Sequence, residues 1–250
     1  RATKGRRIVM PAPPKEEVPA LDILLHYMSS PVTTGRYFEQ ALRKKHNLVT
    51  AGLRCPEAIL NKWGFPGEAP QYPAHDVDTG LNTSYKELLA RLPGGFSPAL
   101  YLWVDSGPKE IAPDIERLGV PKSSYLIDTH LAPEIRIDIA RHFDVVFLAQ
   151  KAQVPLFQDA GISNVFWLPL GCSPELHEVG DLERIHDVAY IGRIQDDPHD
   201  RRRLMLDKVR ERFPNHVIGQ QWPEDMARTY AQSKIVINAA VHNDLNMRVF

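Results

Sequence analysis

Short runs of apolar residues alternate with segments of helical periodicity along most of this chain. Such runs predict buried strands, and apolar residues three and four positions apart predict helices. The predicted strands are 22–28, 48–51, 99–104, 124–127, 145–149, 164–168, 187–192, 216–218 and 235–237. The predicted helices cover 36–45, 84–92, 111–118, 135–143, 154–160, 204–213 and 226–231. This alternation predicts an α/β fold with parallel sheets that are covered on both faces.

Breaks in the alternation suggest the domain organisation. Residues 1–20 are rich in proline and predict an extended lead-in. Residues 21–171 hold enough strands for an N-terminal Rossmann-like domain, although the proline-rich stretch 54–83 within it is predicted to be irregular. Residues 172–186 predict a linker. Residues 187–250 have only three predicted strands, so we expect the chain to stop within an incomplete C-terminal Rossmann-like domain.

The composition excludes some classes of partner. The chain has 250 residues, is 43% hydrophobic and 24% charged, and has a net charge of −1, which is typical of a soluble globular protein. This charge gives no general attraction to nucleic acid. No apolar stretch approaches the roughly 18 residues of a transmembrane helix, and no signal peptide is evident. Cys55 and Cys172 lie far apart, which suggests reduced thiols, with one disulfide between them as the alternative. We therefore expect a cytoplasmic protein without a transmembrane segment.

Polar residues follow the predicted strands of the C-terminal domain. Gly192 and Arg193 come directly after the strand 187–192. Glycine allows a ligand to approach the backbone, and a guanidinium followed by a helix N-terminus suits a pyrophosphate. An ordinary turn with solvated arginines is the alternative, because the GxGxxG fingerprint is absent. The strand 235–237 is followed by further candidate ligand-binding residues, which are Asn238, Asp244, Asn246 and Arg248.

Three strand ends of the N-terminal domain also carry candidate site residues. Asp128 and His130 follow the strand 124–127, where His130 could stabilise developing charge while Asp128 holds its tautomer. A capping aspartate beside a structural histidine is an equal alternative. Asp105 follows the strand 99–104, and a turn-forming role is favoured over a ligand contact. A third set could cradle an acceptor or a phosphate, unless Thr34 is a plain helix cap; it comprises Thr34, Gly35 and Arg36.

No metal or cofactor is predicted. The motifs HExxH, CxxC and DxD are all absent from the sequence. His177, His186 and His199 are scattered around the linker and the second domain, so we interpret them as surface residues rather than metal ligands.

Several blocks of the sequence resemble CgeB-like glycosyltransferases, the spore-maturation-type branch of the group 1 transferases. NVFWLPLGCSPELH at 164–177 is similar to a WLPxxxDPxxH block of that family, although Ser173 stands where the family has Asp. DVAYIGR at 187–193 and YAQSKIVINAAVHNDLNMRVF at 230–250 are also similar. So are TTGRYFEQAL at 33–42 and DVVFLAQKAQVPLFQDAGI at 144–162. The resemblance covers most of residues 22–250.

The resemblance implies a GT-B fold, in which two Rossmann-like domains face each other across a cleft. It implies metal-independent transfer of a sugar from a nucleotide-diphosphate sugar, which is a substrate and not a cofactor, to a glycan or protein acceptor, with retention of configuration. The donor would bind the C-terminal domain and the acceptor the N-terminal one. Arg193 resembles the arginine that binds the pyrophosphate, and His130 the histidine near the transferred sugar. Asn246 and Arg248 would lie near the donor.

Two other classes of function stay open. A sugar-nucleotide epimerase or hydrolase could share the two-domain form, and a non-catalytic module could bind only nucleotide or glycan. Because the second domain is predicted to be incomplete, we expect this fragment by itself to be inactive.

Overall fold

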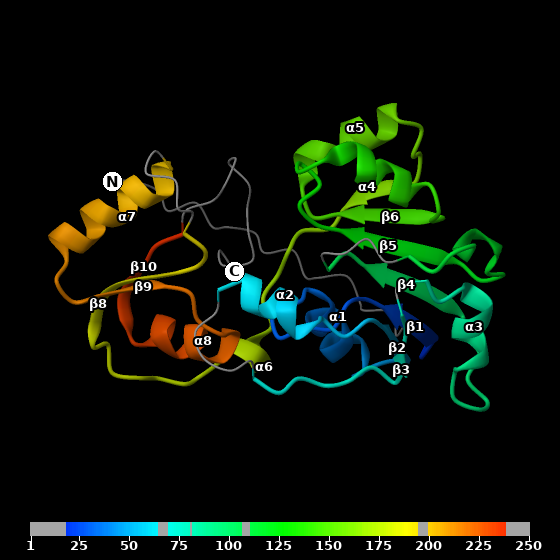
Figure 1. The fold of residues 1–250 in the computed structure, drawn as a ribbon, viewed down its shortest axis with the longest axis horizontal. Coiled ribbons are helices and arrows are strands. Elements are labelled where there is room, and N and C mark those ends of the chain that lie inside the picture. Colours follow the sequence, from blue (N-terminus) through cyan, green and yellow to red (C-terminus); the bar gives the residue numbers. More distant parts are fainter. Residues whose placement is uncertain (1–18, 65–69, 81, 107–110, 195–199, 239–250) are drawn as a thin grey trace, which may run out of the picture.

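The computed structural model describes residues 19–64, 70–80, 82–106, 111–194 and 200–238, which form an α/β fold with two parallel sheets (Figure 1). The larger sheet has seven strands: β1 (Asp22–His26), β2 (Asn47–Gly52), β3 (Val77–Asp78), β4 (Leu100–Val104), β5 (Lys122–Leu126), β6 (Val145–Leu148) and β7 (Val165–Trp167). Their order is β3-β2-β1-β4-β5-β6-β7. The first six strands of this order follow a doubly wound, Rossmann-like sheet.

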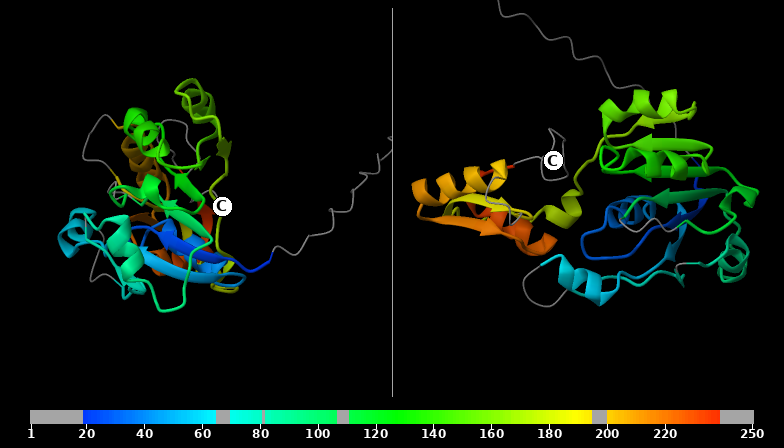
Figure 2. Two further views of the ribbon diagram at one scale, coloured as in Figure 1. Left: turned by 90° about the vertical axis from the view of Figure 1, so that its right-hand side faces the viewer. Right: turned by 45° about the horizontal axis from the view of Figure 1, so that its top comes forward.

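The smaller sheet has three strands, which are β8 (His186–Ile191), β9 (His216–Gly219) and β10 (Ser233–Val236), in the order β10-β8-β9. Helix α7 (Arg201–Arg212) connects β8 to β9, and α8 (Pro223–Ala231) connects β9 to β10. We call the described part from β1 to β7 the first unit and that from β8 to β10 the second unit. The short helix α6 (Pro174–His177) lies where the two units meet (Figure 2).

Helices cover the larger sheet on both faces because its central strands are apolar on both sides. On one face, Leu24 and Trp103 pack in a core with residues of α3 (Tyr85–Ala90), α4 (Pro133–Ala140) and α5 (Val154–Asp159). On the other face, Ile23 and Leu25 pack in a core to which α1 (Gly35–Leu42) contributes Phe38. Successive residues of a strand point to opposite faces, so a continuous apolar run fills both cores.

The predicted strands are confirmed within one to three residues at their ends, and so are most of the helices. The predicted capping box is also confirmed. The Glu87 amide donates to Ser84 Oγ at 3.3 Å, and the Ser84 amide donates to Glu87 Oε2 at 2.9 Å. Two backbone amides at the start of α3 therefore have the side-chain acceptors that the sequence spacing predicts.

Two predictions about irregular or helical segments are wrong. The segment 54–83 contains α2 (Glu57–Lys62), for which Pro56 serves as N-cap, and also β3, which forms by pairing with β2. The segment 111–118 forms only a 3₁₀ turn (Ile115–Arg117), because Asp114 has a left-handed φ of 61° that a helix cannot continue through. The predicted linker contains α6.

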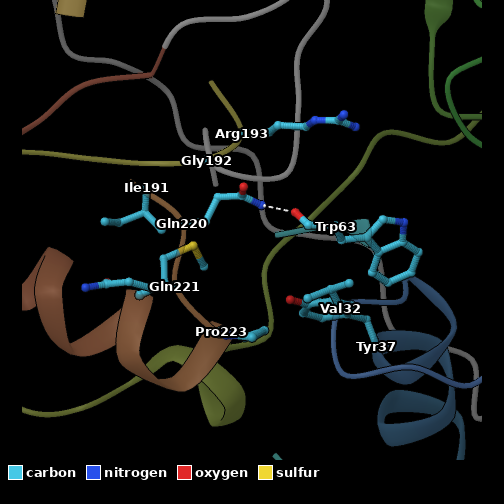
Figure 3. A pocket seen from close by; sticks show the side chains of 10 residues that line it. Val32, Tyr37, Trp63, Ile191, Gly192, Arg193, Gln220, Gln221 and Pro223 are labelled. Carbon is cyan, nitrogen blue, oxygen red and sulfur yellow. Dashed lines mark hydrogen bonds between the residues drawn. The ribbon is translucent and has the colours of Figure 1, made fainter. Parts of the chain in front are cut away.

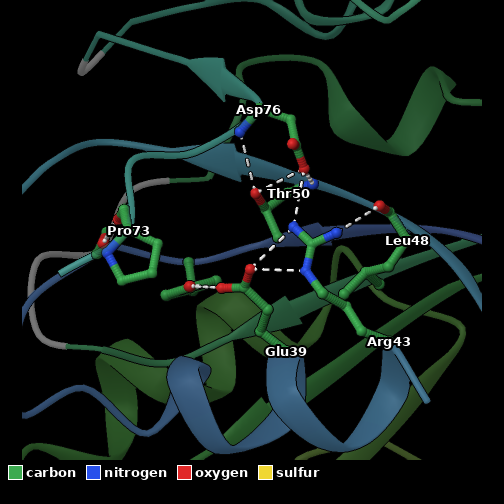
Figure 4. A network of polar contacts seen from close by, with 8 residues as sticks. Glu39, Arg43, Leu48, Thr50, Pro73 and Asp76 are labelled. Carbon is green, nitrogen blue, oxygen red and sulfur yellow. Dashed lines mark hydrogen bonds and ion pairs between the residues drawn. The ribbon is translucent and has the colours of Figure 1, made fainter.

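A polar network fastens the segment before β3 to α1 and β2 (Figure 4). Arg43 Nη2 lies 2.8 Å from Glu39 Oε1 and 3.1 Å from Asp76 Oδ2. Asp76 Oδ2 also accepts from the Thr50 amide at 2.8 Å and from the Thr50 hydroxyl at 3.0 Å. Partial burial opposes ionisation of Asp76, but the Thr50 and Arg43 donors outweigh it and lower the pKa of this carboxyl. The network therefore favours the ionised carboxylate.

Each sheet has one point at which its strand order reverses. From β1 the chain runs outward to β2 and β3 and then returns to β4, on the other side of β1. In the smaller sheet, β9 and β10 lie on opposite sides of β8. Ligands of open parallel sheets bind outside the carboxyl ends of the strands at such points. The loops after β1 and after β8 are therefore the places to look for a site.

Among the described residues, no helix has both the length and the apolar character that crossing a bilayer requires.

Candidate functional site

A pocket of about 370 Å³ lies between the two units (Figure 3). Its walls come from loops and helices that follow the carboxyl ends of strands in both sheets. The residues that line it are Val32, Tyr37, Trp63, Ile191, Gly192, Arg193, Gln220, Gln221, Pro223 and Met226. The loops after β1 and β8, where the two strand orders reverse, thus contribute to one pocket. Its lining is mostly apolar with a few polar groups, as in many small-molecule sites.

Gly192 and Arg193, which the sequence predicts to bind a donor, lie at the β8 end of this pocket. The Arg193 carbonyl accepts from Arg202 Nη1 at 2.8 Å and from the Tyr190 hydroxyl at 3.5 Å. These two donors hold the backbone of the turn, while the Arg193 side chain is exposed. Within the described part of the chain, the Arg193 guanidinium forms no ion pair with a carboxylate. Among the described residues, no carboxylate therefore competes with an anionic ligand for this charge.

The N-terminus of α7 does not support the predicted contribution to anion binding. The Asp200 carboxylate caps this helix and accepts from the amides of Arg202 at 2.6 Å and Arg203 at 3.2 Å. A capping carboxylate satisfies these amides and offsets the positive end of the helix dipole. Among the groups predicted to hold the diphosphate after β8, Arg193 is the one that the structure leaves exposed at the pocket.

The first unit supplies the opposite wall through Val32, Tyr37 and Trp63. The Tyr37 hydroxyl lies 2.9 Å from His177 Nε2, and the two rings stack with their centroids 5.6 Å apart. Burial raises the pKa of Tyr37 and lowers the pKa of His177, because desolvation disfavours the charged form of each. His177, predicted to be a surface residue, is partly exposed, and α6 places its ring against α1.

Two further contacts join the units beside the pocket. Gln220 Nε2 donates to the Trp63 carbonyl oxygen at 2.9 Å, across 157 positions of sequence. Arg36 Nη2 lies 3.5 Å from Glu224 Oε1 on α8, and the Arg36 side chain is 19% exposed. A ligand in the pocket therefore lies against both units.

The residues predicted to cradle an acceptor surround the start of α1, but their amides already have partners. The Gly35 amide donates to Thr33 Oγ1 at 3.3 Å, and the Arg36 amide donates to the Thr33 carbonyl at 3.4 Å. Thr34 is buried, and the Arg36 guanidinium also donates to the Pro31 carbonyl at 2.6 Å. An added Cβ on Gly35 would lie 2.1 Å from the Tyr27 ring, so close packing explains the glycine. The amides of Gly35 and Arg36 would have to give up these bonds to bind a ligand.

Asp105 lies at the end of β4, where it is 2% exposed. Its Oδ2 is 3.1 Å from Arg136 Nε, and Arg136 extends from α4. Arg136 also donates to the carbonyl oxygen of Ile127 at 2.8 Å and to that of Leu131. Asp105 thus anchors the loops after β4 and β5, which fits the favoured turn-forming role better than a ligand contact.

Asp128 and His130 follow β5, one strand further from the point of reversal. Asp128 is exposed and has a φ of 50°, and its carbonyl accepts from the Leu131 amide at 2.8 Å. His130 is half-buried. Neither belongs to the described residues that line the pocket. The structure therefore does not place His130 at this pocket, and its catalytic role stays a prediction.

The remaining predicted donor residues follow β10. Asn238 is half-buried just beyond this strand, on the side of β8 opposite β9. Asp244, Asn246 and Arg248 lie outside the described residues.

Sequence reasoning missed Trp63, Gln220 and Gln221. The two glutamines follow β9 in the same way that Gly192 and Arg193 follow β8, so the rule on strand ends could have found them. Trp63 lies in the segment predicted to be irregular, and no local signal places it at the pocket. Among the described residues, no group of three or more His, Cys, Asp or Glu side chains could hold a metal ion.

No protein-family model matches the chain, and no curated protein matches its sequence.

Proposed function

We propose that this protein transfers a sugar from a nucleotide-diphosphate sugar to a glycan or protein acceptor. The observation that carries the proposal is the shared pocket, which strand-end loops of both parallel sheets build and which holds the exposed Arg193 guanidinium. Two facing sheets of this kind fit the GT-B arrangement, in which one unit binds the donor and the other the acceptor. The second unit, with Gly192 and Arg193, is the donor side.

The chemistry depends on the charge that develops on the leaving nucleotide diphosphate. As the bond between the sugar carbon and the diphosphate oxygen breaks, negative charge gathers on the diphosphate. Arg193 would stabilise that charge from the β8 end of the pocket, and Gly192 would let the diphosphate approach the backbone. The acceptor hydroxyl would approach from the first unit. The apolar side chains of Val32, Ile191 and Met226 would limit access of water, and hence hydrolysis of the donor.

The contacts between the units support a site that is complete only when the units are together. The Gln220–Trp63 bond and the Arg36–Glu224 ion pair hold the observed arrangement. These are only two polar contacts. Breaking them to let a substrate enter between the units would therefore cost little free energy. Closure of such a site around the donor orders the reacting groups before transfer.

The test compares the Arg193→Ala variant of the full-length protein with the unchanged full-length protein. Binding of UDP, GDP, ADP and CDP is measured by calorimetry, and transfer is measured with the corresponding nucleotide sugars and a panel of glycan and peptide acceptors. Loss of a charged contact to the leaving group should lower turnover by about 10²–10³-fold. Arg212→Ala is the matched control, because Arg212 is an exposed arginine at the opposite end of α7.

Each outcome has a distinct meaning. Equal turnover of the two variants would remove Arg193 from the proposed role. Donor breakdown at full rate without any acceptor would favour a hydrolase or an epimerase. Nucleotide binding with no transfer to any acceptor would identify a binding module instead of a transferase.

A further inference from the structure

The indole of Trp63 stands at the pocket without an aromatic or cationic partner among the described residues. Trp63 is the C-cap residue of α2, and the following Gly64 has a left-handed φ of 72° that ends the helix there. Part of the Trp63 side chain packs against the buried cluster of Met28, Cys55 and Leu60. The side chain is thus held by the first unit while it contributes to the wall of a pocket between the units.

The other tryptophans are engaged differently. Trp103 is buried in the core and packs beside Phe143, with ring centroids 6.0 Å apart. Trp167 lies on β7 with Lys151 Nζ 4.9 Å from its ring centroid. Trp222 is 7% exposed. Of the four tryptophans, all within the described residues, Trp63 is the one that lines the pocket.

Two glutamines of the second unit line the pocket together with Trp63. Gln220 donates to the Trp63 carbonyl, so the bond involves the backbone and not the indole. The Oε1 of Gln221 has almost no solvent-accessible surface, so a ligand in the pocket would not reach this acceptor. Figure 3 shows Gln220 and Trp63 at the same pocket, with the Arg193 side chain extending toward the Trp63 side and the Gln221 side chain directed away from it.

These features define two kinds of contact in one pocket, which are the planar aromatic surface of Trp63 and the guanidinium of Arg193. They match two parts of a nucleotide, the flat base and the phosphate chain. A monosaccharide ring could also pack on an indole, but it has no anionic end for the guanidinium.

We propose that Trp63 determines specificity at this site by stacking on the base of the nucleotide. The inference rests on the proposed function, because it assigns the donor's base to the same pocket. It adds that the first unit, and not only the donor-binding second unit, recognises the nucleotide. Nucleotide binding would then favour the observed arrangement of the units, since the base contacts the first unit and the phosphates contact Arg193 of the second.

The experiment follows tryptophan fluorescence during titration with nucleoside diphosphates, with the uncharged nucleosides and with free monosaccharides. Stacking of a base on an indole quenches its emission, so the unchanged protein should show quenching by the diphosphates and, at higher concentration, by the nucleosides. In the Trp63→Leu variant the quenching should vanish and the affinity measured by calorimetry should fall about 5–150-fold. Trp63→Phe keeps an aromatic ring and should lose less affinity than Trp63→Leu.

The controls separate stacking from other effects. Trp167→Leu removes a partly exposed tryptophan on β7 that does not line the pocket, and it should leave quenching and affinity unchanged. All Trp63 variants keep the backbone carbonyl that Gln220 binds, so they do not remove the contact between the units. The Trp63→Phe variant also guards against misfolding, because it conserves most of the packing against Met28, Cys55 and Leu60.

The outcomes distinguish this inference from the proposed function. If diphosphates bind in a manner that depends on Arg193 but Trp63→Leu binds them equally well, stacking is refuted and the proposed function stands. If monosaccharides and not nucleosides require Trp63, the indole faces the sugar, and the inference about the base is refuted. If no nucleoside diphosphate binds the unchanged protein, both proposals are refuted.

Discussion

Removal of the Asp105 carboxylate tests whether this residue anchors the loops after β4 and β5 or instead binds a ligand. Asp105 and Arg136 form an ion pair whose side chains are 3% and 13% exposed. Asp105→Ala would leave the Arg136 guanidinium largely buried without its carboxylate. Breaking a buried pair by removal of one partner costs about 3–5 kcal/mol of folding free energy. Because Arg136 keeps the carbonyl oxygens of Ile127 and Leu131 as acceptors, we expect a value near the lower end.

Thermal unfolding followed by circular dichroism measures this effect. For a domain of this size, about 3 kcal/mol corresponds to a fall of about 6–12 °C in Tm. The matched control is Asp138→Ala, which breaks an ion pair with Arg141 whose side chains are 71% and 55% exposed. Surface pairs of this kind contribute about 0–1 kcal/mol. Equal shifts for the two variants would refute the anchoring role and return Asp105 to the candidates for acceptor binding.

Three further predictions concern stability. Burial, with a smaller effect of His75, lowers the pKa of His26 from 6.5 to about 3. The free energy of unfolding should therefore be highest above pH 6.5 and fall by about 1.4 kcal/mol per pH unit below it. In urea unfolding, His26→Gln should reduce this slope. Gly35→Ala forces a methyl group against the Tyr27 ring and should cost about 1–3 kcal/mol of unfolding free energy by the same method. Ser84→Ala removes the capping box of α3 and should cost about 0.5–2 kcal/mol, measured as a lower urea midpoint.

Each of these predictions has a control of the same chemical type. His142→Gln replaces an exposed histidine, so the free energy of unfolding should fall below pH 6.5 as steeply as in the unchanged protein. If His26→Gln also left this slope unchanged, His26 would not be its source. Gly119→Ala adds a methyl group where no atom lies within 4 Å, and a loss as large as that of Gly35→Ala would contradict the packing argument. Lys86→Ala changes an exposed residue of α3, and it should leave the urea midpoint nearly unchanged.

Local sequence signals predicted individual elements where the cause of the element is local. The capping box at Ser84 and the apolar run of β1 each depend on residues a few positions apart, and both are confirmed. Strand β3 has two residues and forms only because Val77 and Asp78 pair with β2, so no periodicity could reveal it. The left-handed Asp114 likewise ended a helix that the spacing of apolar residues had predicted.

Local and long-range causes can also be separated for the residues of the pocket. The rule that ligands bind beyond strand ends identified Gly192 and Arg193 as pocket residues, because this rule needs only the order of elements along the chain. Their partners on the opposite wall, Tyr37 and Trp63, are more than 100 positions away in sequence. The contact between Tyr37 and His177 and the bond between Gln220 and Trp63 depend on how the two units meet.

The sequence by itself therefore determined the α/β class, the parallel strands and the residue types at the β8 end, since apolar periodicity and strand-end residues are local properties. Only the tertiary structure decided which strand ends face each other and that Asp105 forms an ion pair with Arg136. It also showed that the first amides of α7 donate to the Asp200 carboxylate. The physical reason is that burial and partner choice are properties of the folded chain. A polar side chain can meet a ligand only if the folded chain leaves it exposed at a pocket, as it leaves Arg193.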